Sequence, residues 1–77
     1  VEVTMSAATF AVCIQNTGYE AALQLRKIYQ VLEDSEASRY ARVRVIDESG
    51  EDYLFPADFF TPIQLPESLV LRFLQAA

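Results

Sequence analysis

The first apolar run of the chain covers residues 9–15 and is rich in residue types that favour strands. It ends at Asn16-Thr17-Gly18, a cluster in which the polar side chains and the glycine favour a turn. The pattern therefore predicts a first strand over residues 9–15.

Residues 19–33 fit two different structures. Four apolar residues recur there at spacings of four, three and four, which favours an amphipathic helix (Ala21, Leu25, Ile28 and Leu32). Residues 28–32, in contrast, are dense in β-branched and aromatic residues, and a strand buried on most sides need not alternate cleanly. Both structures stay open on this pattern alone. The polar residues 33–39 favour a loop or a single helical turn, with Asp34 or Ser35 available as its cap.

A β-hairpin is the clearest element of the pattern. Apolar and polar residues alternate over residues 40–46, the polar residues 47–51 favour a turn, and residues 53–55 are apolar again. A three-residue loop of type I geometry needs its last residue in the left-handed region, which suits Gly50. We therefore predict a hairpin with this loop.

The loop also fixes the register of the hairpin, because it pairs Asp47 with Glu51. Counting outward places Arg44 opposite Leu54 on one face of the sheet. The other face then carries four large apolar side chains: Val43, Val45, Tyr53 and Phe55.

The C-terminal third predicts three short elements. Pro56 ends the hairpin strand because it lacks a donor, residues 57–60 fit one tight helical turn, and residues 62–65 form a final strand. Pro66-Glu67 is typical of a helix start, and an apolar stripe follows it (Leu69, Val70, Phe73 and Leu74). A helix over residues 66–77 is too short to be stable alone, so it needs a surface to pack on.

This order of elements resembles the Src homology 3-like (SH3-like) barrel. The resemblance rests on four runs: residues 11–14, residues 23–32, the hairpin, and residues 53–60. The closest local match is Pro56-Ala57-Asp58-Phe59, which looks like that family's proline and aromatic residue on the helical turn beside the last strand. Runs such as residues 25–29 and 45–54 are also similar to small uncharacterised bacterial proteins.

The resemblance implies a mainly β fold, an SH3-like five-stranded small barrel with a short C-terminal helix. The expected parts are a flexible tail over residues 1–8, the barrel over residues 9–65 and the helix over residues 66–77. The alternative is an α+β domain with a helix at about residues 19–33.

Composition supports one folded domain, because 52% of the 77 residues are apolar and only five are Gly or Pro. The net charge of −5 argues against nucleic-acid binding, which depends on cations that neutralise phosphates. A local basic strand is the exception that the sequence allows, and it carries three arginines: Arg39, Arg42 and Arg44.

The single cysteine, Cys13, cannot form an internal disulfide, and the chain has no histidine. We therefore predict a buried thiol, no metal site and no cofactor. Residues 1–14 lack the pattern of a signal peptide or a membrane span, so we expect a cytoplasmic protein without a membrane partner.

An enzyme is not expected, because without histidine the base would have to be a carboxylate. The acids at residues 48–58 are instead typical of a solvated hairpin end. Adjacent Phe59 and Phe60 should not both point inward, and the C-terminal stripe must be covered. The sequence thus predicts a protein-interaction or accessory module, with an unidentified protein or a second copy as partner.

Two sets of residues are the candidates for such contacts. For a partner, they are the tyrosines, the proline and the adjacent phenylalanines around the helical turn (Tyr19, Tyr53, Pro56, Phe59 and Phe60). For a homodimer, they belong to the C-terminal stripe (Leu69, Val70 and Phe73). The alternative is that the C-terminal helix simply folds back over the aromatic turn.

Overall fold

Strands dominate residues 9–75, the part of the chain that the computed structural model describes. In chain order the elements are β1 (Thr9–Cys13), β2 (Ile28–Leu32), α2 (Ser35–Ser38), β3 (Arg42–Ile46), β4 (Asp52–Pro56), the 3-10 turn η1 (Ala57–Phe59), β5 (Phe60–Ile63) and α3 (Glu67–Gln75). The tail predicted over residues 1–8 and the last two residues of the predicted helix lie outside the described residues.

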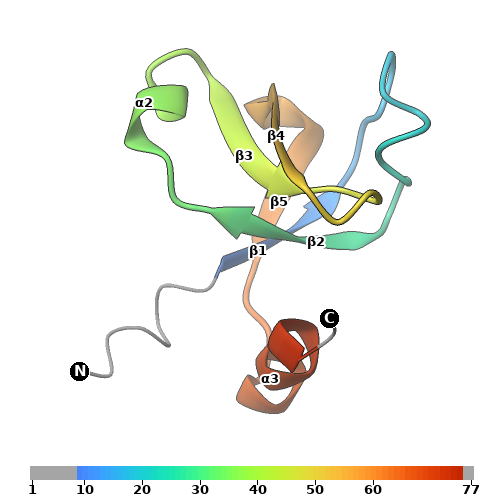
Figure 1. The fold of residues 1–77 in the computed structure, drawn as a ribbon, viewed down its shortest axis with the longest axis vertical. Helices are drawn as coiled ribbons and strands as arrows, with labels where there is room; N and C mark the ends of the chain where they lie inside the picture. The colour runs from blue at the N-terminus through green and yellow to red at the C-terminus, as the bar shows by residue number, and fades with distance from the viewer. Residues whose placement is uncertain (1–8, 76–77) are drawn as a thin grey trace.

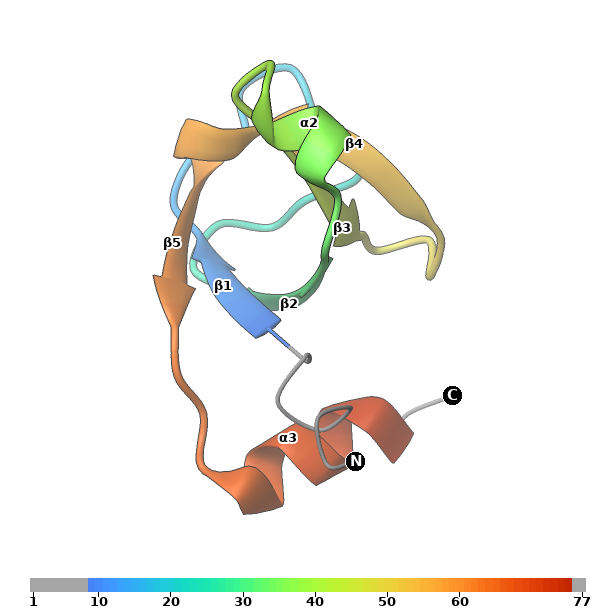
Figure 2. The same cartoon turned by 90° about the vertical axis from the view of Figure 1, so that its left-hand side faces the viewer.

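The five strands form one antiparallel sheet in the order β4-β3-β2-β1-β5. The sheet coils around a common interior but does not close, so β4 and β5 are its two edges (Figure 2). In Figure 1, α3 lies on the far side of β1 and β2 from the β3–β4 hairpin. The prediction of a mainly β chain with five strands and a short C-terminal helix is confirmed.

The alternative of a helix at about residues 19–33 is wrong. Residues 28–32 form β2, which lies between β1 and β3, and residues 14–27 form a long loop. β2 pairs with β1 over Ile28–Val31 and with β3 at Val31 and Leu32, and Tyr29 is buried in the core. β-branched and aromatic residues are well suited to such a buried strand. Leu25, one of the residues that suggested the stripe, remains exposed in the loop.

The hairpin has the predicted register. Asp47 N–H donates to the Glu51 carbonyl at 3.0 Å, Gly50 N–H donates to the Asp47 carbonyl at 2.9 Å, and Gly50 has a φ of 87°. Val43, Val45 and Phe55 face the interior as expected. Tyr53 differs, because it lies on the edge strand beside the turn and stays 49% exposed.

The core lies inside the coiled sheet and includes one residue from the long loop. Its buried members are Ala11, Cys13, Leu23, Tyr29, Val45, Phe55 and Phe60. The Cys13 side chain is buried as predicted, and this burial raises the pKa of the thiol above its usual value of 9.0. Leu23 is fully buried although it belongs to no strand, so the loop forms one wall of the core.

The last strand begins two residues earlier than predicted. Phe60 directly follows η1, has extended backbone angles (φ −131°, ψ 144°) and pairs with Cys13. Its ring belongs to the core. Pro62 lies within β5, opposite Ala11. The bond from Ile14 N–H to the Phe59 carbonyl fixes the alternation, and it directs the Pro62 nitrogen away from β1. The proline therefore removes no bond from the sheet.

Leu23→Ala should test whether the loop is part of the core. We expect a loss of about 2–5 kcal/mol in the free energy of unfolding, because a fully buried leucine leaves a cavity. Leu25→Ala is the matched control in the same loop and should change stability by less than about 0.5 kcal/mol. Guanidinium unfolding followed by circular dichroism measures both. Equal losses would mean that Leu23 does not anchor the loop.

Candidate functional site

The aromatic turn predicted as a partner site is mostly turned inward. Phe60 is only 8% exposed and belongs to the core, and Phe59 is half-buried against it, so the expectation that one ring must point outward is wrong. The backbone changes from the 3-10 turn to a strand between the two residues, which lets both rings reach the interior. Phe60 is therefore not a surface residue.

The other three residues of that set do not form one surface. Tyr19 packs edge-on against Phe59 and Phe55, with ring centroids 5.8 and 5.2 Å apart. Pro56 is half-buried beside η1, and Tyr53 donates its hydroxyl hydrogen to Glu51 Oε1 at 3.0 Å. Tyr19 and Phe59 thus come together as part of the loop packing, and Tyr53 has a separate contact with the hairpin turn.

Of the three arginines of the predicted basic strand, Arg44 is held by ion pairs with two carboxylates. Arg44 contacts two carboxylates, with Nε 2.8 Å from Asp34 Oδ2 and Nη1 3.0 Å from Asp52 Oδ2. Asp34 also caps α2 by accepting from Ala37 N–H at 3.0 Å, and this bond and Arg44 lower the pKa of the Asp34 carboxyl. Arg44 is therefore held in a structural contact and is not available to bind phosphate.

The two other arginines of the predicted basic strand, Arg39 and Arg42, lie on the surface. Arg39 is 73% exposed and stands 3.9 Å from Glu36 Oε1, a distance at which an exposed pair contributes little. Arg42 is exposed at the start of β3. Without Arg44, these two side chains make a much smaller basic surface than the sequence suggested.

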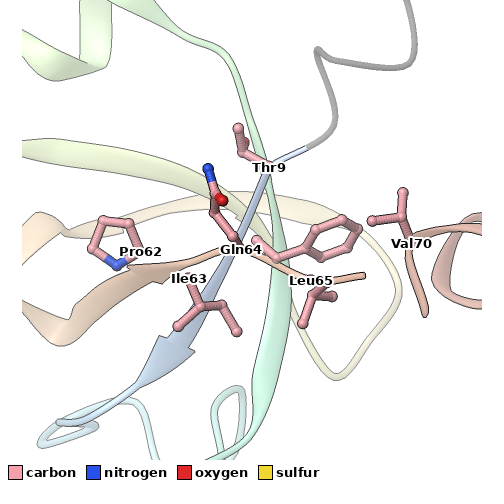
Figure 3. A pocket seen from close by; sticks show the side chains of 7 residues that line it. Thr9, Pro62, Ile63, Gln64, Leu65 and Val70 are labelled. Atoms are coloured by element: carbon pink, nitrogen blue, oxygen red, sulfur yellow. The ribbon is translucent and has the colours of Figure 1, made fainter. Parts of the chain in front are cut away.

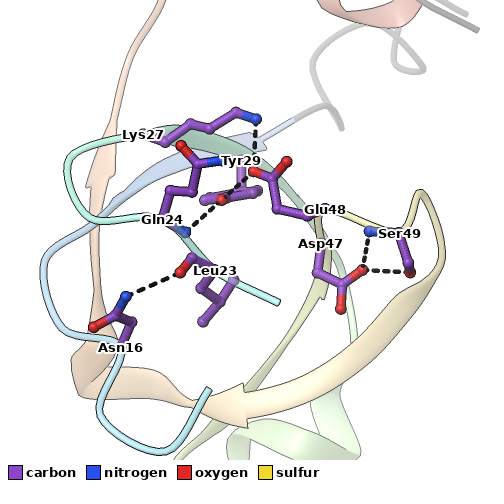
Figure 4. Close-up of polar contacts among 8 residues, drawn as sticks. All are labelled: Asn16, Leu23, Gln24, Lys27, Tyr29, Asp47, Glu48 and Ser49. Carbon is purple, nitrogen blue, oxygen red and sulfur yellow. Dashed lines mark hydrogen bonds and ion pairs between the residues drawn. The ribbon is translucent and has the colours of Figure 1, made fainter. Parts of the chain in front are cut away.

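A polar network joins the long loop to the hairpin (Figure 4). The hydroxyl of the buried Tyr29 accepts from Gln24 N–H at 2.8 Å and donates to Glu48 Oε2, and Lys27 Nζ lies 2.6 Å from the same oxygen. Glu48 N–H in turn donates to the Ala22 carbonyl at 3.1 Å. These contacts join residues 22–29 to the start of the hairpin turn, so their geometry fits a structural clamp between the loop and the hairpin.

No feature of the sequence predicts this network. The pattern places Glu48 among the acids of a solvated hairpin end, and its partners lie 19 and 21 residues earlier in the chain. No local pattern links such distant positions. The sequence does show a lysine and a tyrosine on either side of Ile28, two residue types that can bind a carboxylate. This local composition does not indicate which carboxylate is the partner.

The hairpin acids have local structural roles too. Asp47 is buried and accepts from the Ser49 backbone N–H at 2.8 Å and from the Ser49 hydroxyl at 2.6 Å, which orders the turn.

Within residues 9–75, no three histidine, cysteine or acidic side chains lie close enough together to hold a metal ion. In the same range no helix has the length and apolar character needed to cross a membrane.

The helix α3 combines a contact with the sheet and exposed leucines. Phe73 faces the body of the protein, with its ring centroid 5.1 Å from that of Phe10 on β1. Phe10 is buried but does not belong to the core cluster that lies inside the coiled sheet. Its contact with Phe73 therefore covers the outer face of the sheet. Three leucines of the same helix stay exposed, by 44%, 41% and 42% (Leu69, Leu71 and Leu74). We call these three leucines the α3 leucines.

Two grooves lie against α3. The first has a volume of about 530 Å³ and is lined by Ile63, Leu65 and Val70 among others (Figure 3). The second, of about 620 Å³, includes Phe73 and Ile46 in its lining and extends to the polar network at Glu48. Val70 and Phe73 are half-buried, so of the three residues predicted for self-association only Leu69 is largely exposed.

Comparison of the chain with protein-family models, with curated proteins and with solved structures gave no match. The functional interpretation therefore rests on the geometry of the chain itself.

Glu48→Gln should reduce the sensitivity of the fold to acid. Lys27 and Tyr29 hold the pKa of Glu48 below its usual value of 4.5, so the stability from its ionised form is present above pH 4.5. This stability is lost as the pH falls through the lower, folded-state pKa. The difference in unfolding free energy between wild type and variant should shrink between pH 7 and pH 3, as measured by guanidinium titration at each pH. A constant difference would contradict the clamp.

Tyr29 should give the fold an alkaline limit. Burial, and then the bond to Glu48, raise the pKa of Tyr29 to about 12 from its usual value of 10.0. A raised folded-state pKa means that this contribution is complete below pH 10 and is lost as the pH rises toward 12. Ultraviolet titration of tyrosinate should show one tyrosine ionising near pH 12, and Tyr29→Phe should remove that step. A step that persists in the variant would assign it to another tyrosine.

Proposed function

We propose that the chain is a non-enzymatic protein-interaction module that binds its partner through the α3 leucines and the grooves beside them. The observation that carries this proposal is that α3 attaches through Phe73 and leaves Leu69, Leu71 and Leu74 at least 41% exposed. A nine-residue helix is not stable alone in water, so three exposed leucines on it are a feature to be explained. Extensive exposed apolar surface is typical of interaction sites.

An SH3-like fold is part of the same proposal. The order of strand, long loop, strand, hairpin, 3-10 turn and strand supports it, as does the position of Pro56 and Phe59 at η1. The aromatic turn predicted as a partner site is not the favoured surface here, because Tyr19 and Phe59 pack on the core. A cytoplasmic location and a bacterial origin stay predictions from the sequence.

Self-association through Leu69, Val70 and Phe73 is the second candidate. It is supported less well, because Val70 and Phe73 are half-buried against their own chain and would have to leave it to meet a second copy. A nucleic-acid role is supported least, since Arg44 is held by Asp34 and Asp52 and the net charge is −5.

The double variant Leu69→Ser, Leu74→Ser should abolish partner binding without unfolding the domain. Tagged protein is used to capture partners from a lysate, and the purified partner is then titrated by calorimetry. We expect at least a tenfold loss of affinity, because both changes remove apolar area that the partner would bury, and each 1.4 kcal/mol lost corresponds to about a tenfold change in affinity.

The matched control is Leu25→Ser, which changes a leucine of the same exposure, 44%, in the long loop. It should bind the partner as the wild type does. Equal binding by the double variant and the control would reject the α3 surface. Recovery of nucleic acid alone, lost with Arg42→Glu, would favour the basic strand instead.

A further inference from the structure

β4 is an edge strand with backbone groups directed outward. Hydrogen bonds at both ends of the hairpin fix the alternation: Asp47 N–H donates to Glu51, and Ala57 N–H donates to the Ala41 carbonyl at 2.9 Å. In an antiparallel ladder every second residue pair is hydrogen-bonded, so Tyr53 and Phe55 bond to β3. The N–H and C=O groups of the alternate residues therefore point away from the sheet, at Asp52, Leu54 and Pro56.

These outward groups are accessible. Within residues 9–75, no backbone hydrogen bond beyond the sheet ladder involves Asp52 or Leu54. Residues 51–54 are all exposed, and Leu54 is 41% exposed although it is large and apolar. Pro56 supplies an outward carbonyl but has no N–H, so it limits the edge at one end only. A free edge with unpaired donors and acceptors is a template for another strand.

We propose that β4 pairs antiparallel with β4 of a second copy of this chain, about a two-fold axis at Leu54. In this register Leu54 of one copy lies opposite Leu54 of the other, and Asp52 lies opposite Pro56. Leu54 N–H donates to the Leu54 carbonyl across the axis, and Asp52 N–H donates to the Pro56 carbonyl. The two-fold axis repeats each bond, so the pair forms four backbone hydrogen bonds and joins two sheets into one.

Side chains favour this register. Arg42 pairs with Pro56 in the sheet and is exposed on the same face, so Asp52 of one copy, whose carboxylate also contacts Arg44 of its own chain, approaches Arg42 of the other across Pro56. The two Leu54 side chains meet at the axis, where each covers the other's apolar surface. A shift of the axis to Tyr53 would keep four hydrogen bonds but place Asp52 opposite Leu54, which matches charge with an apolar side chain. The Leu54 axis is therefore the better one.

The paired surface is small, so the dimer is expected to be weak and concentration-dependent. It does not depend on the proposed function of the α3 leucines, because α3 takes no part in the β4 edge. The two proposals can therefore fail separately.

Sedimentation equilibrium up to about 1 mM protein, with amide exchange of Asp52 and Leu54 followed by NMR, tests the proposal. We expect a dimer and slower exchange at these two amides as concentration rises. Leu54→Pro removes the outward N–H and the leucine side chain at the axis without removing a hydrogen bond to β3, and it should abolish the dimer. Leu54→Lys places two cations at the axis and should do the same. Leu71→Lys, an equally exposed leucine on α3, is the control and should dimerise normally.

Pro56→Ala tests the register by gain of function. The new N–H donates to the Asp52 carbonyl of the other copy, which adds two hydrogen bonds per dimer and should tighten it roughly tenfold. If Leu54→Pro loses its circular dichroism spectrum, Leu54→Lys decides the matter. A monomer at every concentration, or a dimer that Leu54→Lys leaves intact, overturns the proposal. A dimer lost only in Leu71→Lys assigns association to α3, and an unchanged affinity in Pro56→Ala rejects the Leu54 axis.

Discussion

The structure depends on how the long loop covers an open sheet. Five strands coil around the core without closing, and a gap between two edges would leave the core exposed to water. Residues 14–27 fill it: Leu23 is fully buried in the core, and Tyr19 packs on Phe55 and Phe59. The contacts of Glu48 with Lys27 and Tyr29 hold the loop against the hairpin. The loop is therefore one wall of the core, and its position determines how completely the residues inside the sheet are buried.

Sequence reasoning succeeded where structure follows from neighbouring residues. The hairpin register was predictable, because Gly50 fits the left-handed position of its loop and the alternation of valines allows one pairing only. The cap of α2 and the 3-10 turn at residues 57–59 are also local features. In each of these cases the residues that decide the structure are only a few positions apart.

It failed where the deciding partner is distant in the chain. The spacing of apolar residues in 19–33 fitted a helix, but pairing of β2 with both β1 and β3 overrides that preference. Phe60 turns inward because Cys13 lies opposite it. The sequence pattern places Arg44 in a basic strand and Glu48 in a solvated turn, but the side-chain partners of these two residues lie 8 to 21 positions away in the chain. The candidate surfaces changed accordingly, from the aromatic turn to α3.

The internal use of charge explains why apolar groups remain the features available for binding. Lys27 and Arg44, two of the six basic residues, are engaged by carboxylates that also order the loop and α2. The surplus charge is acidic and repels polyanions, and exposed ion pairs contribute little to association. A small chain that buries only part of its apolar surface leaves the rest at its periphery, on the short α3 and on the β4 edge at Leu54. Contacts with other molecules are therefore expected at α3 and at the β4 edge, and not inside the coiled sheet.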